Sequence, residues 1–293
     1  MGVGHYENFP VASVLCPPRL RPPIVAIYHF ARVADDIADE GDAPSEVRLQ
    51  ALRRYRVALD CAARGAPAAR ASDASPTDEW PEVFGPLARE IAAFGLPPQL
   101  LHDLLDAFEQ DVHNPTYADR EALLDYCRRS ANPVGRLLLH LYDIRDSTAL
   151  ARSDDICTAL QLINFWQDLS VDGPRGRHYV PAADAARHGV SFAELQQRHD
   201  SERARALVRE LCAWAGSLMQ AGAPLALQLP GRAGWELRLV VQGGLRILEK
   251  IAGMQHASLT DRPRLGAWDL LPMLWRSLAM SAPPRPAARG AMP

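Results

Sequence analysis

The chain carries, at residues 161–172, the stretch QLINFWQDLSVD, which places four polar side chains along one line of a predicted helix. At 3.6 residues per turn, Gln161, Asn164, Asp168 and Asp172 occur at i, i+3, i+7 and i+11. Apolar residues take the other faces, so the helix is expected to be buried on more than one side. Carboxylates withdrawn from water need a compensating positive charge, and the acidic oxygens here outnumber any nearby base in the sequence. We therefore predict a bound cation; a solvated acidic helix end is the alternative.

A second acidic cluster occurs in FARVADDIADE, residues 30–40, at the end of a helix predicted to begin near Pro22 and stop before Gly41. Asp35 and Asp39 are four residues apart, so their side chains are neighbours about 5–6 Å apart at Cβ. Acids at the carboxyl end of a helix also oppose its dipole. A cation would offset both effects, and a capping cluster is the alternative.

Composition points to a soluble globular protein with a substantial core. Of the 293 residues, 48% are hydrophobic and 23% are charged, and the net charge of -3 gives no reason to expect nucleic acid. The five cysteines are scattered without a CxxC pair, which is typical of reduced thiols in a cytoplasmic protein. No signal peptide appears, and no apolar run reaches the roughly 18–20 residues that span a bilayer. We expect a cytoplasmic location and leave open peripheral contact with the inner membrane.

Helical patterns recur along the whole chain, whereas no strand pattern of period two, internal repeat or Gly-rich nucleotide fingerprint is present. We predict an all-α protein, a single helical bundle spanning residues 1–280 around a central apolar cavity, with a disordered tail at 281–293 and a surface loop at 65–79. Asp119 and Ser153 are predicted to cap helices, and Ser191 with Glu194 forms a capping box. The other predicted helices cover residues 44–64, 81–94, 98–112, 201–221, 235–254 and 267–278.

Several residues outside the two acidic stretches are candidates for contact with a ligand. Tyr126 precedes Pro133, which is expected to bend its helix beside Gly135 and leave room for a bulky ligand. A Tyr on such a helix is more often a core residue, and that alternative stays open. The arm that holds His5 and Glu7 has no clear period, and their role is left undecided.

Three further segments are interpreted from their composition. The run GPRGRHYVP, residues 173–181, brings Arg175, Arg177 and Tyr179 close to the acidic stretch and is a plausible lid over a phosphate. Asp111, near the end of helix 98–112, is expected to lie at a solvated helix end, although contact with a ligand is an alternative. The apolar face of helix 267–278 is expected to close the fold rather than to touch lipid.

Two acid-bearing helices with apolar faces predict carboxylates that face each other across a helical cavity. Ligands that are all oxygen favour Mg²⁺, and the Glu-x-x-His pairs of a di-iron bundle are missing from the sequence. Protein-bound Mg²⁺ usually completes its shell with water and substrate phosphates. The expected substrate therefore carries a diphosphate and an apolar remainder.

These motifs resemble the two aspartate-rich motifs of the squalene and phytoene synthase family, which here read DDIAD at 35–39 and NFWQDLSVD at 164–172. The resemblance runs from the amino-terminal arm to about residue 255. It implies an isoprenoid synthase fold, Mg²⁺ and head-to-head C30 or C40 prenyl chemistry. Further positions also fit the family pattern: Tyr28, Arg32, Tyr126, Val134, Gly135, Gln161, Arg177 and Tyr179.

Within the family, HYENFPVAS at 5–13 and SANPVG at 130–135 resemble the bacterial hydroxysqualene synthases of hopanoid-type squalene biosynthesis. That resemblance implies conversion of presqualene diphosphate, made by a sister synthase, and water to hydroxysqualene. One departure is GLRILE at 244–249, where many relatives have a Tyr-Arg pair before a similar turn. It weakens an interpretation as a complete synthase that starts from two farnesyl diphosphates, and it means that other groups must meet the diphosphate.

The resemblance assigns roles to the candidate residues. Tyr126 and Gln161 would steady a carbocation or steer a proton, no NADPH is expected, and water would capture the cation. Competing hypotheses are a head-to-head synthase that makes presqualene diphosphate, squalene or phytoene, and a non-catalytic relative. The implied Mg²⁺ ligands are Asp35, Asp39, Asn164, Asp168 and Asp172. The implied diphosphate-binding residues are Arg32, Tyr28, Asn164, Arg177 and Tyr179.

Overall fold

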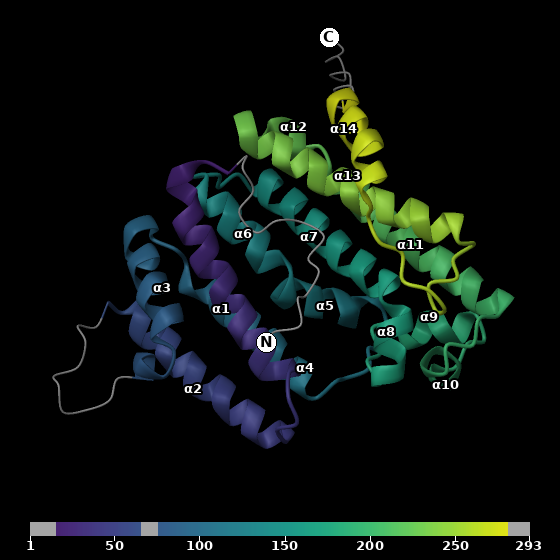
Figure 1. Cartoon of the computed structure of the whole chain (residues 1–293), viewed down its shortest axis with the longest axis horizontal. Helices are drawn as coiled ribbons and strands as arrows, with labels where there is room; N and C mark the ends of the chain where they lie inside the picture. Colours follow the sequence, from purple (N-terminus) through teal and green to yellow (C-terminus); the bar gives the residue numbers. More distant parts are fainter. Residues whose placement is uncertain (1–15, 66–75, 281–293) are drawn as a thin grey trace, which may run out of the picture.

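The computed structural model describes residues 16–65 and 76–280, and every regular element in these two ranges is a helix (Figure 1). The predicted all-α class is thus confirmed for the described part of the chain. His5, Glu7, the predicted tail and residues 66–75 of the predicted loop lie outside the described residues. The α-helices are α1 Arg21–Asp39, α2 Ser45–Ala63, α3 Pro81–Phe94, α4 Pro98–Val112, α5 Arg120–Ser130, α6 Asn132–Leu141, α7 Ser147–Gln167, α8 Leu169–Asp172, α9 Ala182–Arg187, α10 Phe192–Gln196, α11 Glu202–Gly222, α12 Leu225–Gln228, α13 Gly231–Gly253 and α14 Leu270–Ala279. The short 3-10 helices are η1 Pro18–Leu20, η2 Pro76–Glu79, η3 Gly173–Arg175 and η4 Ala267–Asp269.

A first hydrophobic core lies among helices α1 to α4. Its centre is aromatic, because the ring of Tyr55 lies 5.3 Å from that of Phe30 and 4.7 Å from that of Phe84. The Tyr55 hydroxyl donates a hydrogen bond of 3.0 Å to the backbone carbonyl of Phe30, which satisfies the buried polar atom. This core fixes α1, the helix that carries the first acidic motif.

A second core surrounds α7, which packs most extensively against α11 and also against α6 and α13 (Figure 1). Trp166 is fully buried and Phe165 nearly so, as expected for a helix covered on more than one side. Leu137 of α6 belongs to the first core and Leu139 to the second, so α6 joins them.

The second acidic stretch differs from the prediction in its local geometry. Helix α7 begins at Ser147, where the Asp146 side chain accepts a hydrogen bond from Ala149 N at 2.8 Å. The predicted cap at Ser153 is therefore wrong: this residue is buried inside the helix. Helix α7 also ends at Gln167, and Asp172 belongs to the separate single turn α8. Asp168 lies between them, so the four polar residues do not form one straight line.

The predicted bend at Pro133 is instead a break between two helices. Helix α5 ends at Ser130 and α6 begins at Asn132, which places Pro133 in the first turn, where its missing N–H costs no hydrogen bond. Helix α13 begins at Gly231, four residues before the predicted start at 235. The caps at Asp119 and Ser191 are confirmed.

Helix α14 does not close the fold as expected. Only Met273 and Ser277 of this helix are buried, where it packs against α13. The large apolar residues Leu271 and Trp275 remain exposed. None of the described helices combines the length and the apolar character needed to cross a membrane.

Close contact between α6 and α7 depends on Gly135. A Cβ atom at this position would lie 2.4 Å from Ser153 Oγ and 2.5 Å from Cys157 Sγ, which is far inside van der Waals contact. The glycine thus lets α6 approach the helix that carries the second acidic motif.

We predict that Gly135→Ala lowers the free energy of unfolding by about 1–3 kcal/mol, because the added methyl group forces α6 and α7 apart. Urea denaturation followed by circular dichroism measures the change. Gly85→Ala in α3 is the matched control, since a Cβ there meets no atom within 4 Å. The control should leave stability unchanged or raise it by up to about 1 kcal/mol. Equal stability of both variants and the wild type would rule out the close contact.

Candidate active site

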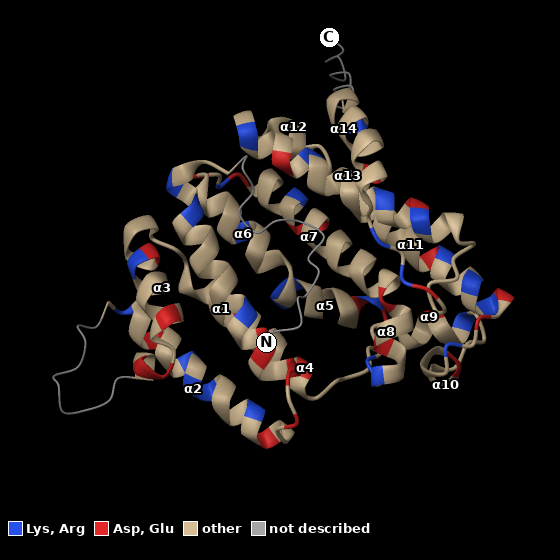
Figure 2. Ribbon diagram, viewed as in Figure 1, with Lys and Arg blue, Asp and Glu red and all other residues tan. Residues whose placement is uncertain are grey.

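A cavity of about 1050 Å³ lies between the two cores, with walls from α1, α4 to α8 and α13 and from residues 262–264. The structure brings all eleven residues predicted for the site onto this wall, whereas their roles stay predictions. They are Tyr28, Arg32, Asp35, Asp39, Tyr126, Gln161, Asn164, Asp168, Asp172, Arg177 and Tyr179. Figure 2 shows charged positions at the ends of α1 and α4 and on α8.

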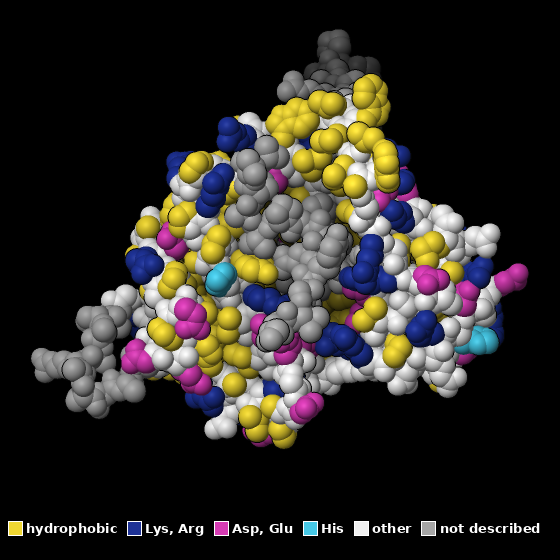
Figure 3. All heavy atoms as spheres, viewed as in Figure 1, with side chains coloured by type: hydrophobic (Ala, Val, Ile, Leu, Met, Phe, Trp, Pro, Cys, Tyr) yellow, Lys and Arg dark blue, Asp and Glu magenta, His cyan; other side chains and the backbone are white. Residues whose placement is uncertain are grey.

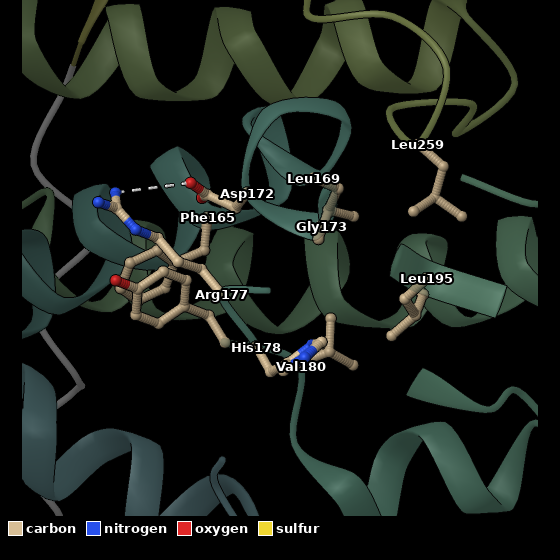
Figure 4. A pocket seen from close by; sticks show the side chains of 10 residues that line it. Phe165, Leu169, Asp172, Gly173, Arg177, His178, Val180, Leu195 and Leu259 are labelled. Atoms are coloured by element: carbon tan, nitrogen blue, oxygen red, sulfur yellow. Dashed lines mark ion pairs between the residues drawn. The ribbon is translucent and has the colours of Figure 1, made fainter. Parts of the chain in front are cut away.

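Arg177 connects the two acidic motifs. Its Nη2 lies 2.7 Å from Asp39 Oδ2 of α1, and its Nη1 lies 3.9 Å from Asp172 Oδ1 of α8. Figure 4 shows the guanidinium facing the Asp172 carboxylate. The backbone N–H of Arg177 also donates to the Asp172 carbonyl at 3.0 Å, which fixes the start of the loop after η3. Two acids that are 133 residues apart in sequence, Asp39 and Asp172, thus share the guanidinium of Arg177.

The acids of α1 have their own arginine. Arg32 Nη1 lies 3.1 Å from Asp35 Oδ2, and its Nη2 forms ion pairs with Asp36 and, at 3.0 Å, with Glu40. This intrahelical network offsets the unfavourable effect of carboxylates at the carboxyl end of the helix.

Arg262 is a site residue that the sequence interpretation missed. Its guanidinium makes a bidentate ion pair with Asp168: Nε donates to Oδ1, and Nη2 donates to Oδ2 at 3.0 Å. The loop that carries it is anchored by Gln167, whose Nε2 donates to the Pro263 carbonyl at 2.6 Å. A signal was available, because LTDRPRLG at 259–266 is bounded by Gly and interrupted by Pro and arginines, like the predicted lid.

The charges that line the cavity are balanced in number. Five aspartates line it: Asp35, Asp39, Asp111, Asp168 and Asp172. Five arginines also line it: Arg32, Arg175, Arg177, Arg262 and Arg264. The expected excess of acidic groups is therefore not found on this wall: Arg262 and Arg264, which are remote in sequence from both motifs, add to the nearby arginines and complete the balance.

The sequence suggested that Asp111 lies at a solvated helix end. In the structure it lies on the cavity wall instead. The Tyr126 hydroxyl donates to Asp111 Oδ2 at 2.9 Å. Burial, together with repulsion from Asp39 and Asp35, raises the pKa of Asp111 to about 7, although the hydrogen bond from Tyr126 lowers it. Burial also raises the pKa of Tyr126 well above its ordinary value, so this hydroxyl stays protonated.

The neighbouring wall is aromatic. Tyr179 stacks on Phe165 with ring centroids 3.8 Å apart and planes only 6° from parallel. Beside these rings, burial and the nearby Asp168 raise the pKa of Asp172 to about 6. Apolar surroundings and neighbouring carboxylates both destabilise an ionised carboxylate. A ligand that brings positive charge would stabilise it.

The donor set fits a hard divalent cation chemically, since it consists of carboxylate and amide oxygens. In residues 16–65 and 76–280, no three His, Cys, Asp or Glu side chains lie close enough together to hold a metal ion by themselves. The cavity carboxylates are instead held by arginines. Water or ligand oxygens would complete the coordination shell of a divalent cation held by these residues.

A family model described as squalene/phytoene synthase matches residues 3–269. This chain belongs to the squalene/phytoene synthase family. It is 33% identical to the hydroxysqualene synthase of Zymomonas mobilis over 89% of this chain and 84% of that protein. It is 31% identical to the presqualene diphosphate synthase of Rhodopseudomonas palustris over 66% of this chain and 64% of that protein.

A solved structure of the family gives the fold. The chain is similar to squalene synthase HpnC of Alicyclobacillus acidocaldarius, with a TM-score of 0.75, 34% identity and coverage of 86% of this chain and 90% of that chain. The family's isoprenoid synthase fold is thereby confirmed.

The departure from the family pattern at 244–249 has a structural consequence. Arg246 does not line the cavity, because its Nε lies 2.7 Å from Asp269 Oδ1 and its Nη1 lies 2.9 Å from Glu249 Oε2. Arg262 and Arg264 lie on the cavity wall. That these two arginines meet the diphosphate stays a prediction.

We predict that Asp111→Asn removes part of the pH dependence of stability. The folded pKa of Asp111, about 7, exceeds the usual value of about 4, so between these values the folded state binds a proton that the unfolded state lacks. The free energy of unfolding of the wild type therefore rises as pH falls from 8 to 5. The stability advantage of the variant over wild type should be about 2–3 kcal/mol larger at pH 8 than at pH 5, and it should vanish only near pH 3–4.

Urea denaturation at both pH values measures this effect. Asp103→Asn on the same helix is the control, because Asp103 does not line the cavity. If Asp111→Asn and the control show the same pH dependence as the wild type, the raised pKa is wrong.

Proposed function

We propose that the chain converts presqualene diphosphate and water to hydroxysqualene and diphosphate. The single observation that carries this proposal is the cavity in which acidic motifs from α1 and α7–α8 lie across from each other and share Arg177. Similarity to the hydroxysqualene synthase of Z. mobilis favours this reaction among those of the family. The substrate would come from a separate presqualene diphosphate synthase.

The charge balance supports a role for Mg²⁺. Five aspartates already match the five arginines on the wall, so a diphosphate would add several unmatched negative charges. We assign Asp35, Asp39, Asn164, Asp168 and Asp172 to hold Mg²⁺. When bound, the metal supplies electrostatic stabilisation of the leaving diphosphate.

The arginines of the cavity wall would bind the diphosphate directly, beside the Mg²⁺ ions. Arg177, Arg32 and Arg262 are paired with aspartates in the structure. Once a diphosphate is present, their N–H groups are suited to donate charge-assisted hydrogen bonds to its oxygens. Tyr28 and Tyr179, on the same wall, add hydroxyl donors.

The rest of the wall fits a hydrocarbon. Phe108, Val134, Leu160, Ile163 and Ile247 line it. Its volume of about 1050 Å³ slightly exceeds the roughly 300–1000 Å³ of common small-molecule sites, which suits a chain of C30 size. Apolar side chains exclude bulk water, so that a carbocation survives until one positioned water reaches it.

We assign Tyr126 and Gln161, which both line the cavity, to position that water. The Tyr126 hydroxyl is protonated and donates to Asp111, so its oxygen is available as an acceptor at the wall. Asp111, with a pKa of about 7, is suited to take the proton that water loses on addition to the cation. No reductant is needed for this outcome.

Condensation of two prenyl diphosphates is the second candidate. It is favoured by the 31% identity to the presqualene diphosphate synthase of R. palustris, which shares the family but starts from different substrates.

We expect the purified protein with Mg²⁺ and presqualene diphosphate to release hydroxysqualene and diphosphate in equal amounts, measured by chromatography and a phosphate-release assay. Chelation by EDTA should abolish the reaction, because the diphosphate then lacks a counterion. Added NADPH should not change the product. Farnesyl diphosphate alone should give no product.

Formation of presqualene diphosphate, squalene or phytoene from prenyl diphosphates would replace the first candidate by the second. A folded protein that turns over neither substrate would point to a non-catalytic relative.

A further inference from the structure

Helix α14 exposes a set of large apolar side chains on the protein surface. Trp268 of η4 is 85% exposed, Trp275 is 72% exposed and Leu278 is 63% exposed. Figure 3 shows apolar side chains gathered over α14 at the top of the molecule. Isolated surface leucines are ordinary, whereas a contiguous set that includes two tryptophans indicates a contact surface.

The exposed residues form one stripe along the helix. Leu271, Leu274, Trp275 and Leu278 occur at i, i+3, i+4 and i+7, which places them on a single face. Met273 and Ser277, the two buried residues of α14, lie on the opposite face against α13. The stripe therefore points away from the protein. We define the α14 stripe as Trp268, Leu271, Leu274, Trp275 and Leu278.

The charged groups beside the α14 stripe have a small excess of positive charge, because three bases, Arg246, Lys250 and Arg276, are paired with two acids, Glu249 and Asp269. Arg276 is the only charged residue of α14, and Figure 2 shows the rest of the helix as uncharged. Asp269, just before α14, is buried and held between Arg246 and Lys250, with Lys250 Nζ 2.5 Å from Oδ2. The sequence after the helix, residues 281–293, contains Arg285 and Arg289 and no acid. Such a surface complements an anionic lipid headgroup layer.

A second copy of the chain fits this surface less well. Stable protein interfaces bury about 800 Å² per partner and use roughly 20–30 residues on each side. The α14 stripe is one helix wide, and a two-fold contact would bring identical basic groups together. An interfacial helix needs only such a stripe, with tryptophans at the boundary between water and acyl chains.

We propose that the α14 stripe docks on the surface of an anionic lipid bilayer, with the helix lying in the interface. Helix α13, which packs against the inner face of α14, contributes Gly243, Gly244 and Ile247 to the cavity wall. Docking through α14 therefore brings this wall of the cavity towards the lipid.

Flotation with vesicles tests the proposal on the full-length protein. Wild type should float with vesicles of phosphatidylcholine and phosphatidylglycerol, less with phosphatidylcholine alone, and less at high salt. A variant with Leu271→Gln, Trp275→Gln and Leu278→Gln should partition about 100-fold more weakly, because three inserted apolar groups are lost. No substrate is present, so the outcome is independent of the proposed reaction.

The control variant carries Val47→Gln and Val57→Gln, which replace exposed apolar residues of α2 and should leave flotation unchanged. Thermal unfolding of the triple variant should match the wild type, since its three positions are exposed. The proposal is overturned if the wild type stays with the soluble fraction, or if the triple variant floats equally well. It is also overturned if light scattering shows a dimer that the triple variant loses while no vesicle binding occurs.

Discussion

The ion pairs of Arg177 with Asp39 and Asp172 are the constraint on which the site depends. Asp39 belongs to α1, which is fixed by the first core, whereas Asp172 follows α7 at the centre of the second core. The separation of the two acidic motifs is therefore set by how the cores pack, through α6 and the close contact at Gly135. A partly buried carboxylate without a partner is costly, so each motif stabilises the position of the other through one guanidinium.

The balance of aspartates and arginines explains how an acid-rich cavity is stable without a ligand. It also makes ligand binding an exchange of partners. In the proposed function, a diphosphate would compete for arginines such as Arg262, and the carboxylates that it frees, such as Asp168, would then need a cation. Binding of diphosphate and of a divalent cation should thus be coupled, since each supplies the charge that the other displaces. The proposed chemistry would then take place at the end of the cavity where both motifs meet.

Local signals in the sequence predicted much of the fold. Helices α3 and α4 begin and end at the predicted residues: Pro occupies the first turn of both, and Gly95 follows the last turn of α3. The cap at Ser153 was wrong because Ser also occurs inside helices. Arg262 was missed because it lies 94 positions from Asp168 in the sequence, and only the folded chain brings the two together. The exposure of α14 was not predictable, since an apolar stripe has the same period whether it is covered or not.

Calorimetric titration of inorganic diphosphate, with and without Mg²⁺, tests the central claim that both acidic motifs and the arginines form one cation-dependent diphosphate site. Mg²⁺ should strengthen binding at least about tenfold for the wild type and for Asp155→Asn, a control on α7 away from the cavity. It should have little effect on Asp168→Asn. Diphosphate affinity that is the same with and without Mg²⁺ in the wild type would contradict the account.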